Sequence, residues 1–139
     1  MKIRKIQLKD YEQYTVLMNT SISLEYFKNF IDNILNENHN IFVIELNNNI
    51  IGTGTVLFEE KLTYNGCKIA HIENIFINGN YRGTGNGKKL VDYILEYSKN
   101  NNCYRADLVC YDNITKFYTK NNFIKHQNSL QFLFSENFK

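Results

Sequence analysis

The chain has 139 residues, and its 43% hydrophobic and 14% aromatic content is enough to build one buried core. A formal net charge of +2, without a basic cluster interleaved with aromatic residues, argues against a nucleic-acid partner. The first residues lack the long apolar region of a signal peptide, and no stretch approaches the length of a transmembrane helix. We therefore expect a single domain over residues 1–139, in a soluble cytoplasmic protein with no membrane partner.

Strands and helices are both predicted along the whole chain, in a mixed order that indicates an α/β fold. Strands are expected at 3–7, 41–46, 50–61, 68–77, 105–109 and 127–133. Helices are expected at 10–19, 23–36, 87–100 and 114–120, and a turn at 47–49. The helix at 87–100 is the best defined, because Leu90, Val91, Ile94 and Leu95 form one apolar face.

The cysteines and the asparagines say little about function. Cys67, Cys103 and Cys110 are odd in number and lack C-x-x-C spacing, so neither a disulfide framework nor a metal site is expected. Asparagine is abundant and proline is absent. We interpret this bias as background composition.

A glycine-rich loop joins the strand at 68–77 to the helix at 87–100. Its sequence is Tyr81-Arg82-Gly83-Thr84-Gly85-Asn86-Gly87-Lys88, and Arg82, Gly85 and Gly87 fit the spacing R-x-x-G-x-G. Residues without a Cβ let the backbone turn tightly and bring its N–H groups close to an anion, and the helix adds its positive end. The P-loop and dinucleotide consensus patterns do not match. The loop is predicted to hold a diphosphate; a plain turn into a helix is the alternative.

The loop resembles motif A of the GNAT superfamily of acyl-CoA-dependent N-acetyltransferases, in which it binds the pyrophosphate of coenzyme A. Downstream, the segment from Asp112 to Phe123 is similar to the family's F-Y-x-K-x-G-F/Y element, with Asn122 where glycine is usual. Within the superfamily, the segments 58–61, 67–75, 102–105 and 110–123 resemble the eukaryotic-type glucosamine 6-phosphate N-acetyltransferases.

This resemblance implies the GNAT fold, a mixed, mostly antiparallel central sheet with splayed fourth and fifth strands, flanked by helices. It also implies acetyl-CoA as co-substrate, a homodimer, and glucosamine 6-phosphate as the acceptor, which feeds nucleotide-sugar synthesis. Acetyl transfer would be direct, in a ternary complex. A covalent route through Cys110 is possible in principle, but the GNAT pattern needs no nucleophilic residue.

Two side chains take catalytic roles by this resemblance. Glu73 is predicted to be the acid/base and amine-positioning group, and a strand carboxylate paired with a cation is the alternative. Tyr118 is predicted to donate a proton to the leaving thiolate, and an aromatic ring packed under the sheet is the alternative. His71 is either catalytic or bonded within the sheet. A backbone N–H near Ile75 would meet the thioester oxygen.

The remaining predicted site residues follow from the same resemblance. The acceptor-binding residues are Lys61, Glu73 and Asn74. The coenzyme-binding residues are Ile75, Phe76, Ile77, Arg82, Gly83, Thr84, Gly85, Asn86, Gly87, Lys88, Asn113, Phe117 and Tyr118. Lys88 and its neighbour Lys89 either face the coenzyme phosphates or form a solvated pair.

Several departures from the family leave the acceptor open. Asn74 stands where the family has Asp, Val109 stands where an acidic residue is common, and the tail at 130–134 lacks a family arginine that helps bind the sugar phosphate. Lys61 is then the best phosphate anchor, although a single charge is a weaker anchor than a bidentate arginine. The alternatives are a GNAT enzyme for another small amine or a protein amine, and a non-catalytic acyl-CoA-binding module. The apolar strand predicted near the tail, with Phe132 and Phe134, would suit a dimer interface.

Overall fold

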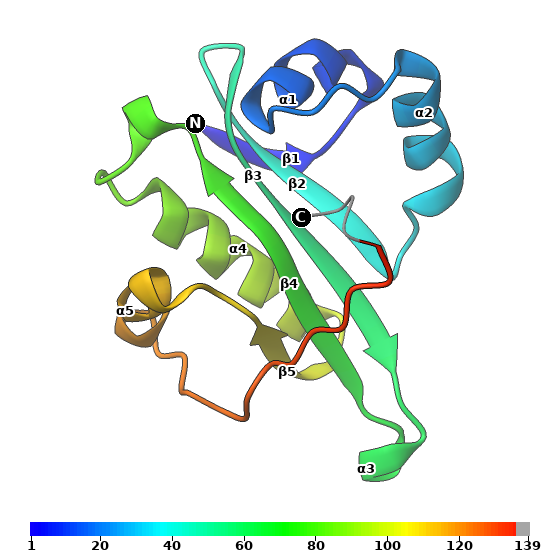
Figure 1. The fold of residues 1–139 in the computed structure, drawn as a ribbon, viewed down its shortest axis with the longest axis vertical. Helices are drawn as coiled ribbons and strands as arrows, with labels where there is room; N and C mark the ends of the chain where they lie inside the picture. The colour runs from blue at the N-terminus through cyan, green and yellow to red at the C-terminus, as the bar shows by residue number, and fades with distance from the viewer. Residues whose placement is uncertain (136–139) are drawn as a thin grey trace. The chain divides into compact units, whose positions relative to one another are not determined.

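A five-stranded sheet with the strand order β1-β2-β3-β4-β5 is the framework of the first 108 residues (Figure 1). Our computed structural model describes residues 1–135, which fall into two units, Met1–Leu108 and the segment from Val109 onward. Strands β1 to β4 pair antiparallel, and β5 pairs parallel with β4. The predicted mixed, mostly antiparallel sheet is confirmed. Among the described residues, no helix is long and apolar enough to cross a membrane.

The bounds of the elements are as follows. The strands are β1 (Lys2–Lys5), β2 (His39–Leu46), β3 (Asn49–Glu60), β4 (Lys68–Ile77) and β5 (Cys103–Leu108). The α-helices are α1 (Tyr11–Leu17), α2 (Leu24–Asn29), α3 (Thr63–Gly66), α4 (Asn86–Asn100) and, in the second unit, α5 (Thr115–Lys120). Three short 3-10 turns lie at Leu8–Asp10, Gly79–Tyr81 and Asp112–Ile114, and a π-helical turn at Phe30–Ile34 follows α2.

Most predicted elements are found within one to three residues of their expected ends. The strand predicted at 127–133 is wrong, because residues 121–135 contain neither helix nor strand. A strand needs a hydrogen-bonded neighbour, and no other described strand pairs with this segment. Its apolar side chains remain in solvent, with Leu130 93% exposed, Phe132 82% and Phe134 98%.

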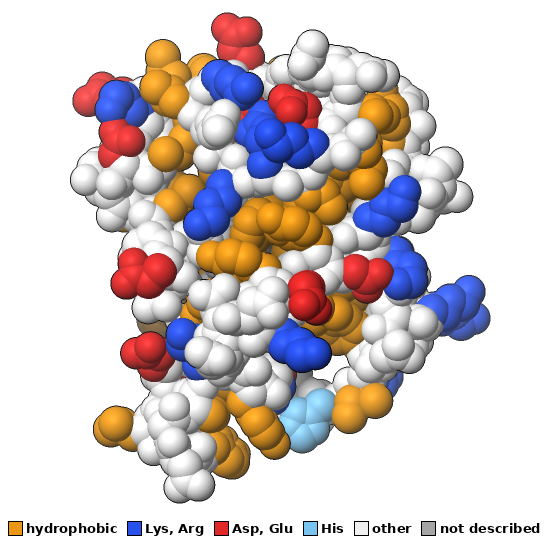
Figure 2. All heavy atoms as spheres, turned by 180° about the vertical axis from the view of Figure 1, so that it is seen from behind, with side chains coloured by type: hydrophobic (Ala, Val, Ile, Leu, Met, Phe, Trp, Pro, Cys, Tyr) orange, Lys and Arg blue, Asp and Glu red, His pale blue; other side chains and the backbone are white. Residues whose placement is uncertain are grey.

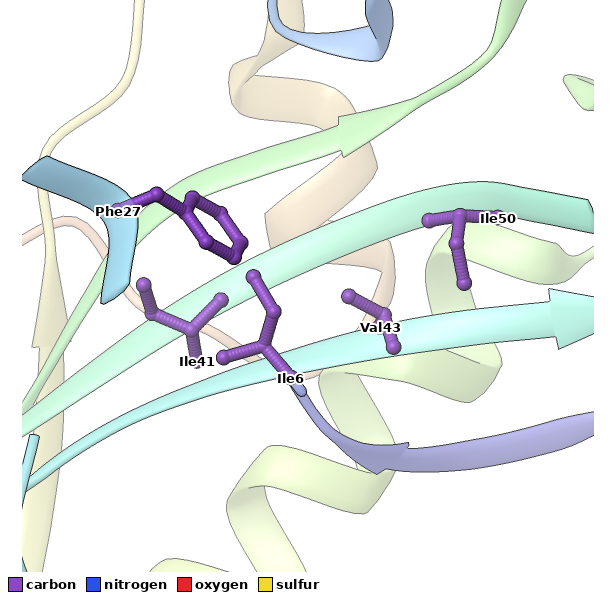
Figure 3. Packing of buried hydrophobic residues seen from close by; sticks show 5 residues of the cluster. All are labelled: Ile6, Phe27, Ile41, Val43 and Ile50. Carbon is purple, nitrogen blue, oxygen red and sulfur yellow. The ribbon is translucent and has the colours of Figure 1, made fainter. Parts of the chain in front are cut away.

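Helices pack on both faces of the sheet (Figure 1). Successive side chains of β2 point to opposite faces, so the strand contributes apolar residues to both layers. Ile41 and Val43 belong to a buried cluster that packs against residues of α1 and α2 (Figure 3). The other members of this cluster are Ile6, Phe27 and Ile50. Between them along the strand, Phe42 turns to the opposite face, where its ring meets those of Tyr93 and Tyr97 of α4 edge-on. Apolar burial on both faces therefore fixes which side of the sheet each residue occupies.

Asparagine supplies most of the left-handed backbone positions outside glycine. Seven of the nine described non-glycine residues with positive φ are asparagines, namely Asn19, Asn47, Asn48, Asn65, Asn74, Asn102 and Asn122. Our interpretation of the asparagine content as background was therefore incomplete, because asparagine tolerates these angles better than most residues.

The end of α5 shows how asparagine replaces glycine. Asn122 has a φ of 69°, and its amide donates to the Thr119 carbonyl at 3.2 Å. The next amide, that of Phe123, donates to the Tyr118 carbonyl at 3.0 Å, which completes a Schellman motif. The substitution of asparagine for the usual glycine thus leaves this helix end intact.

Charges on the surface are mixed in sign. On the face shown in Figure 2, Lys and Arg side chains are interspersed with Asp and Glu, and hydrophobic side chains lie between them. Two of the ion pairs join residues four apart: Lys28 of α2 pairs with Asp32 of the π-helical turn, and Lys88 pairs with Asp92 within α4. Exposed pairs of this kind contribute little to stability.

One ion pair is buried and ties β1 to the turn before α1. The two terminal nitrogens of Arg4 donate to the two carboxylate oxygens of Asp10, each at 2.8 Å, and one also donates to Glu45 of β2 at 3.1 Å. Asp10 is only 2% exposed, and it accepts a further bond from the Gln7 amide at 2.8 Å. Burial raises the pKa of Asp10, but the hydrogen bonds from Arg4 and Gln7 outweigh it, so the pKa of the carboxyl lies below its usual value.

The substitution Asp10→Asn should lower the free energy of unfolding at pH 7 by about 3 kcal/mol, because it breaks a buried pair and leaves the Arg4 charge under-compensated. Because the folded-state pKa of Asp10 is lowered, its stabilisation is present above the unfolded pKa of about 3.9 and is lost as the pH falls through the folded pKa. Urea unfolding at a series of pH values should show the gap between wild type and D10N closing below about pH 4.

The exposed Asp32→Asn variant is the matched control, and it should change the free energy of unfolding by no more than about 0.5 kcal/mol. Equal stability of D10N and wild type at pH 7 would show that the Arg4 pair does not hold this corner of the fold.

Candidate active site

An irregularity in β4 lies next to the predicted catalytic residue Glu73. The register of the β3–β4 ladder shifts there, so that Asn74 and Ile75 oppose the single residue Gly54. Asn74 has a φ of 53°, in the left-handed region. Two residues facing one, with a left-handed residue among them, make a β-bulge.

The bulge reverses the alternation of side chains along β4. Before it, Ala70 pairs with Phe58, whose ring stacks on Tyr97, so the even-numbered residues of this part face α4. After it, Ile75 also lies on the α4 side, because a Cβ added to Gly54 would come within 2.6 Å of Ile75 Cδ1 and 2.9 Å of Ile94 Cδ1.

This reversal separates Glu73 from the core. Its carboxylate lies on the face opposite α4 and is exposed, and it makes no hydrogen bond or ion pair with any residue in the described part of the chain. The alternative interpretation was that the Glu73 carboxylate is paired with a cation. Among residues 1–135 no cation pairs with it. The side chain is available to a bound amine.

β4 and β5 pair only along the first half of β4. The register runs from Lys68 opposite Cys103 to Ile72 opposite Leu108, where β5 ends. Within the first 108 residues, positions 73–77 of β4 have no strand partner on that side. The predicted splay of the two strands is confirmed. It leaves a free strand edge, to which an extended molecule can add by backbone hydrogen bonding.

The loop after β4 leaves a series of backbone amides without partners. The amides of residues 83–88 donate to no described residue. Gly83 and Gly85 have φ values of 77° and 87°, and the space beside each of them is open. Glycine is therefore needed there for the backbone angle and not for lack of room. Gly85 is also the N-cap residue of α4, so the positive end of that helix adds to the free amides.

Side chains at both ends of the loop fix its shape. Arg82 Nε donates to the Ile77 carbonyl at 2.7 Å, and its guanidinium carbon lies 5.1 Å from the centre of the Phe76 ring. The Asn86 amide group donates to the Tyr81 carbonyl at 3.0 Å and to Thr84 Oγ1 at 3.1 Å. In the described part of the chain the terminal nitrogens of Arg82 make no hydrogen bond, so they can meet an anion.

Lys88 forms an ion pair with Asp92 one turn along α4. The side chains of the two are 59% and 51% exposed. This favours the solvated interpretation of the Lys88 side chain, although its backbone amide remains among the free amides of the loop.

His71 is bonded within the sheet, as one of its two interpretations held. Its Nε2 lies 2.9 Å from Glu59 Oε1 of β3, and the same oxygen lies 3.5 Å from Lys61 Nζ. The hydrogen bond with His71, followed by the charge of Lys61, lowers the pKa of Glu59 below its usual value. Glu59 was not among the predicted site residues. The sequence offered one signal for it: Glu59 is two positions before Lys61, and residues two apart in a strand share a face.

In the second unit, Tyr118 of α5 is 8% exposed. Its ring packs edge-on against Phe117 at 4.9 Å and Phe123 at 5.5 Å. Burial, with a smaller effect of Cys110, raises the pKa of the Tyr118 phenol, so the group keeps its proton at neutral pH. Asn113 is exposed in the turn before α5. The coenzyme-binding roles of these residues stay predictions.

Residues 2–123 match the family model described as the acetyltransferase (GNAT) family. The chain belongs to this family. The free strand edge on β4 and the loop of unpaired amides are therefore features of a GNAT acetyltransferase.

Individual relatives are similar over most of this GNAT chain. It is 30% identical over 129 residues to a glucosamine 6-phosphate N-acetyltransferase from Arabidopsis thaliana, with 86% of this chain and 87% of that protein covered. A crystal structure of the Arabidopsis thaliana glucosamine-6-phosphate N-acetyltransferase matches with a TM-score of 0.90 at 29% identity, over 96% of this chain and 98% of that chain. A predicted acetyltransferase from Clostridium acetobutylicum, solved with acetyl-CoA, shares the fold with a TM-score of 0.70 at 22% identity, over 95% of each chain.

The bulge makes a direct prediction about Asn74. Asn74→Val should lower the free energy of unfolding by about 1–3 kcal/mol, because a β-branched residue is strained at positive φ. Asn74→Gly should keep the stability within about 0.5 kcal/mol, because glycine adopts this angle freely. Urea denaturation of the three proteins measures both effects.

Asn49→Val is the matched control, since Asn49 begins β3, is exposed and has an ordinary φ. We expect it to change the stability by less than about 0.5 kcal/mol. If N74V costs no more than N49V, the left-handed angle at Asn74 is not what the position requires.

Proposed function

We propose that this acetyltransferase transfers the acetyl group of acetyl-CoA to the amine of glucosamine 6-phosphate. The observation that carries this acceptor is the likeness to the Arabidopsis enzyme in both sequence and structure, over most of both chains. Transfer is direct: the amine nitrogen forms a bond to the acetyl carbon, and the bond from that carbon to the coenzyme sulfur breaks.

The loop after β4 receives the coenzyme. The free amides of residues 83–88, the positive end of α4 and the guanidinium of Arg82 bind the pyrophosphate, whose charge they complement. The free edge of β4 at residues 73–77 pairs with the pantetheine arm. Ile75, Phe76 and Ile77 of this edge therefore belong to the coenzyme site. A backbone N–H near Ile75 stabilises the oxygen of the thioester as negative charge develops there.

Two side chains move the protons. Glu73 takes the proton of the amine, directly or through a water, and its exposed position beside the bulge supports this role. Tyr118 returns a proton to the departing thiolate. A phenol has an ordinary pKa of about 10, so it carries a proton at neutral pH, and burial raises the pKa of Tyr118 in the same direction. Tyr118 therefore has a proton to give to the thiolate. Lys61 binds the phosphate of the acceptor, and Asn74 binds its sugar hydroxyls.

We further propose that the protein works as a homodimer in the cytoplasm. The apolar residues near the tail support the dimer, because Leu130, Phe132 and Phe134 are each more than four-fifths exposed in the single chain. An exposed apolar segment of this kind gains from burial against another molecule.

Two features of the chain favour a second candidate acceptor, another small amine. Val109 is 73% exposed where the resembled family often has an acidic residue, and the sequence after Val109 contains no arginine. Both features remove contacts that an amino-sugar phosphate would use.

An acceptor panel with acetyl-CoA decides between these candidates. Release of free thiol should be faster with glucosamine 6-phosphate than with glucosamine, with kcat/KM at least about tenfold higher, because the phosphate adds a charged contact. Activity with another amine, without activity toward glucosamine 6-phosphate, would end the first proposal.

Glu73→Gln should lower kcat by about 100-fold or more, and Tyr118→Phe by about 100-fold, because each variant removes a proton-transfer group. The KM for acetyl-CoA should change little in E73Q, since its carboxylate acts on the amine. Steady-state assays at saturating coenzyme give these values.

Tyr104→Phe is the matched control for Y118F, because Tyr104 is 70% exposed in β5. It should retain wild-type turnover. Full activity of both E73Q and Y118F would show that neither residue has the role proposed for it.

A further inference from the structure

One carboxylate oxygen on β3 serves two basic side chains. Glu59 Oε1 lies 2.9 Å from His71 Nε2 and 3.5 Å from Lys61 Nζ. Both basic groups approach the same oxygen, so the carboxylate links them. The side chains remain accessible, with 49% of Glu59, 37% of His71 and 30% of Lys61 exposed.

The three groups lie on the same face of the sheet as Glu73. His71 and Glu73 are two residues apart in β4, ahead of the bulge, so their side chains point to one side and their Cα atoms are about 7 Å apart. Lys61 follows the end of β3, but its ammonium turns back along the strand to reach Glu59. A hexosamine 6-phosphate has its amine and its phosphate at opposite ends, and it can extend from Glu73 past His71 to Lys61.

The other charged groups nearby already have partners. Asp107 of β5, which is in register with His71, binds Arg105 at 3.1 Å. Glu60 lies 3.9 Å from Lys68 at the start of β4. Lys61 differs from these cations because its carboxylate partner, Glu59, is also bonded to His71.

We propose that Glu59 is a specificity-determining residue that positions Lys61 for the phosphate of the acceptor. His71 fixes the carboxylate by its hydrogen bond, and the carboxylate holds the flexible lysine side chain over the sheet before the substrate arrives. A lysine free in solvent would have to lose its rotamer freedom on binding, whereas a lysine already held has lost it in advance. The inference rests on the proposed function, since it concerns how the same site recognises a phosphorylated amine.

Two substitutions separate positioning from charge. Glu59→Ala removes the link, so KM for glucosamine 6-phosphate should rise about fivefold or more while kcat is retained. KM for unphosphorylated glucosamine should not change, because that acceptor makes no use of Lys61. Glu59→Gln keeps an oxygen that accepts from both partners, and its KM for glucosamine 6-phosphate should stay within about twofold of wild type.

Glu60→Ala is the matched control, because it removes the adjacent carboxylate, whose side chain is 72% exposed and, among residues 1–135, forms an ion pair with Lys68 alone. It should leave the ratio of the two acceptors unchanged. The NMR signals of the His71 ring should shift in E59A and not in E60A, which checks the bond itself without any substrate.

The outcomes are distinguishable from a failure of the proposed function. If the wild-type protein does not acetylate glucosamine 6-phosphate, the function is wrong. If it does, and E59A leaves the preference over glucosamine unchanged or weakens both acceptors equally, the positioning role of Glu59 is overturned. A rise in KM as large in E59Q as in E59A would also overturn it, since charge rather than position would then matter.

Discussion

The left-handed bulge at Asn74 is the constraint on which the rest of the site depends. β4 must bury isoleucines against α4 on one face and present Glu73 on the other. A regular strand would place Ile75 on the same face as Glu73. The extra residue reverses the alternation, and Gly54 on β3 provides the space into which Ile75 then packs. Core packing and the exposure of the carboxylate are thus set by one backbone angle.

In the function that we propose, the two halves of the site use different physical means. The coenzyme half is built from backbone: unpaired amides, a helix end and a strand edge, all held by glycine angles and by the side-chain bonds of Arg82 and Asn86. The acceptor half is built from side chains on the sheet face, where Glu59 links His71 and Lys61. Backbone groups recognise what all acyl-CoA molecules share, whereas side chains can change without disturbing the fold.

Elements that depend on interactions between residues close in the sequence could be predicted, and those that depend on distant residues could not. Strands β2 to β4 and helix α4 could be predicted because their apolar periodicity is local, and the loop could be predicted because its glycine spacing is local. The strand expected at 127–133 could not, since a strand depends on a neighbour that the pattern does not specify. The bulge was missed because Asn74 was interpreted as a polar contact, and its angle is visible only once β3 and β4 are in register. The bond between Glu59 and His71 depends on that same register.

The frequent use of asparagine in turns has a chemical consequence for the lifetime of the protein. Asn65, Asn78 and Asn86 each precede a glycine, whose unhindered amide nitrogen can attack the asparagine side chain, expel ammonia and leave aspartate or isoaspartate after hydrolysis. At Asn86 this change would remove the donor that reaches Tyr81 and Thr84, and it would add a carboxylate to the loop that we propose binds the anionic coenzyme. The hydrogen bonds from the Asn86 amide group to Tyr81 and Thr84 hold this side chain in place, and we expect them to slow its deamidation.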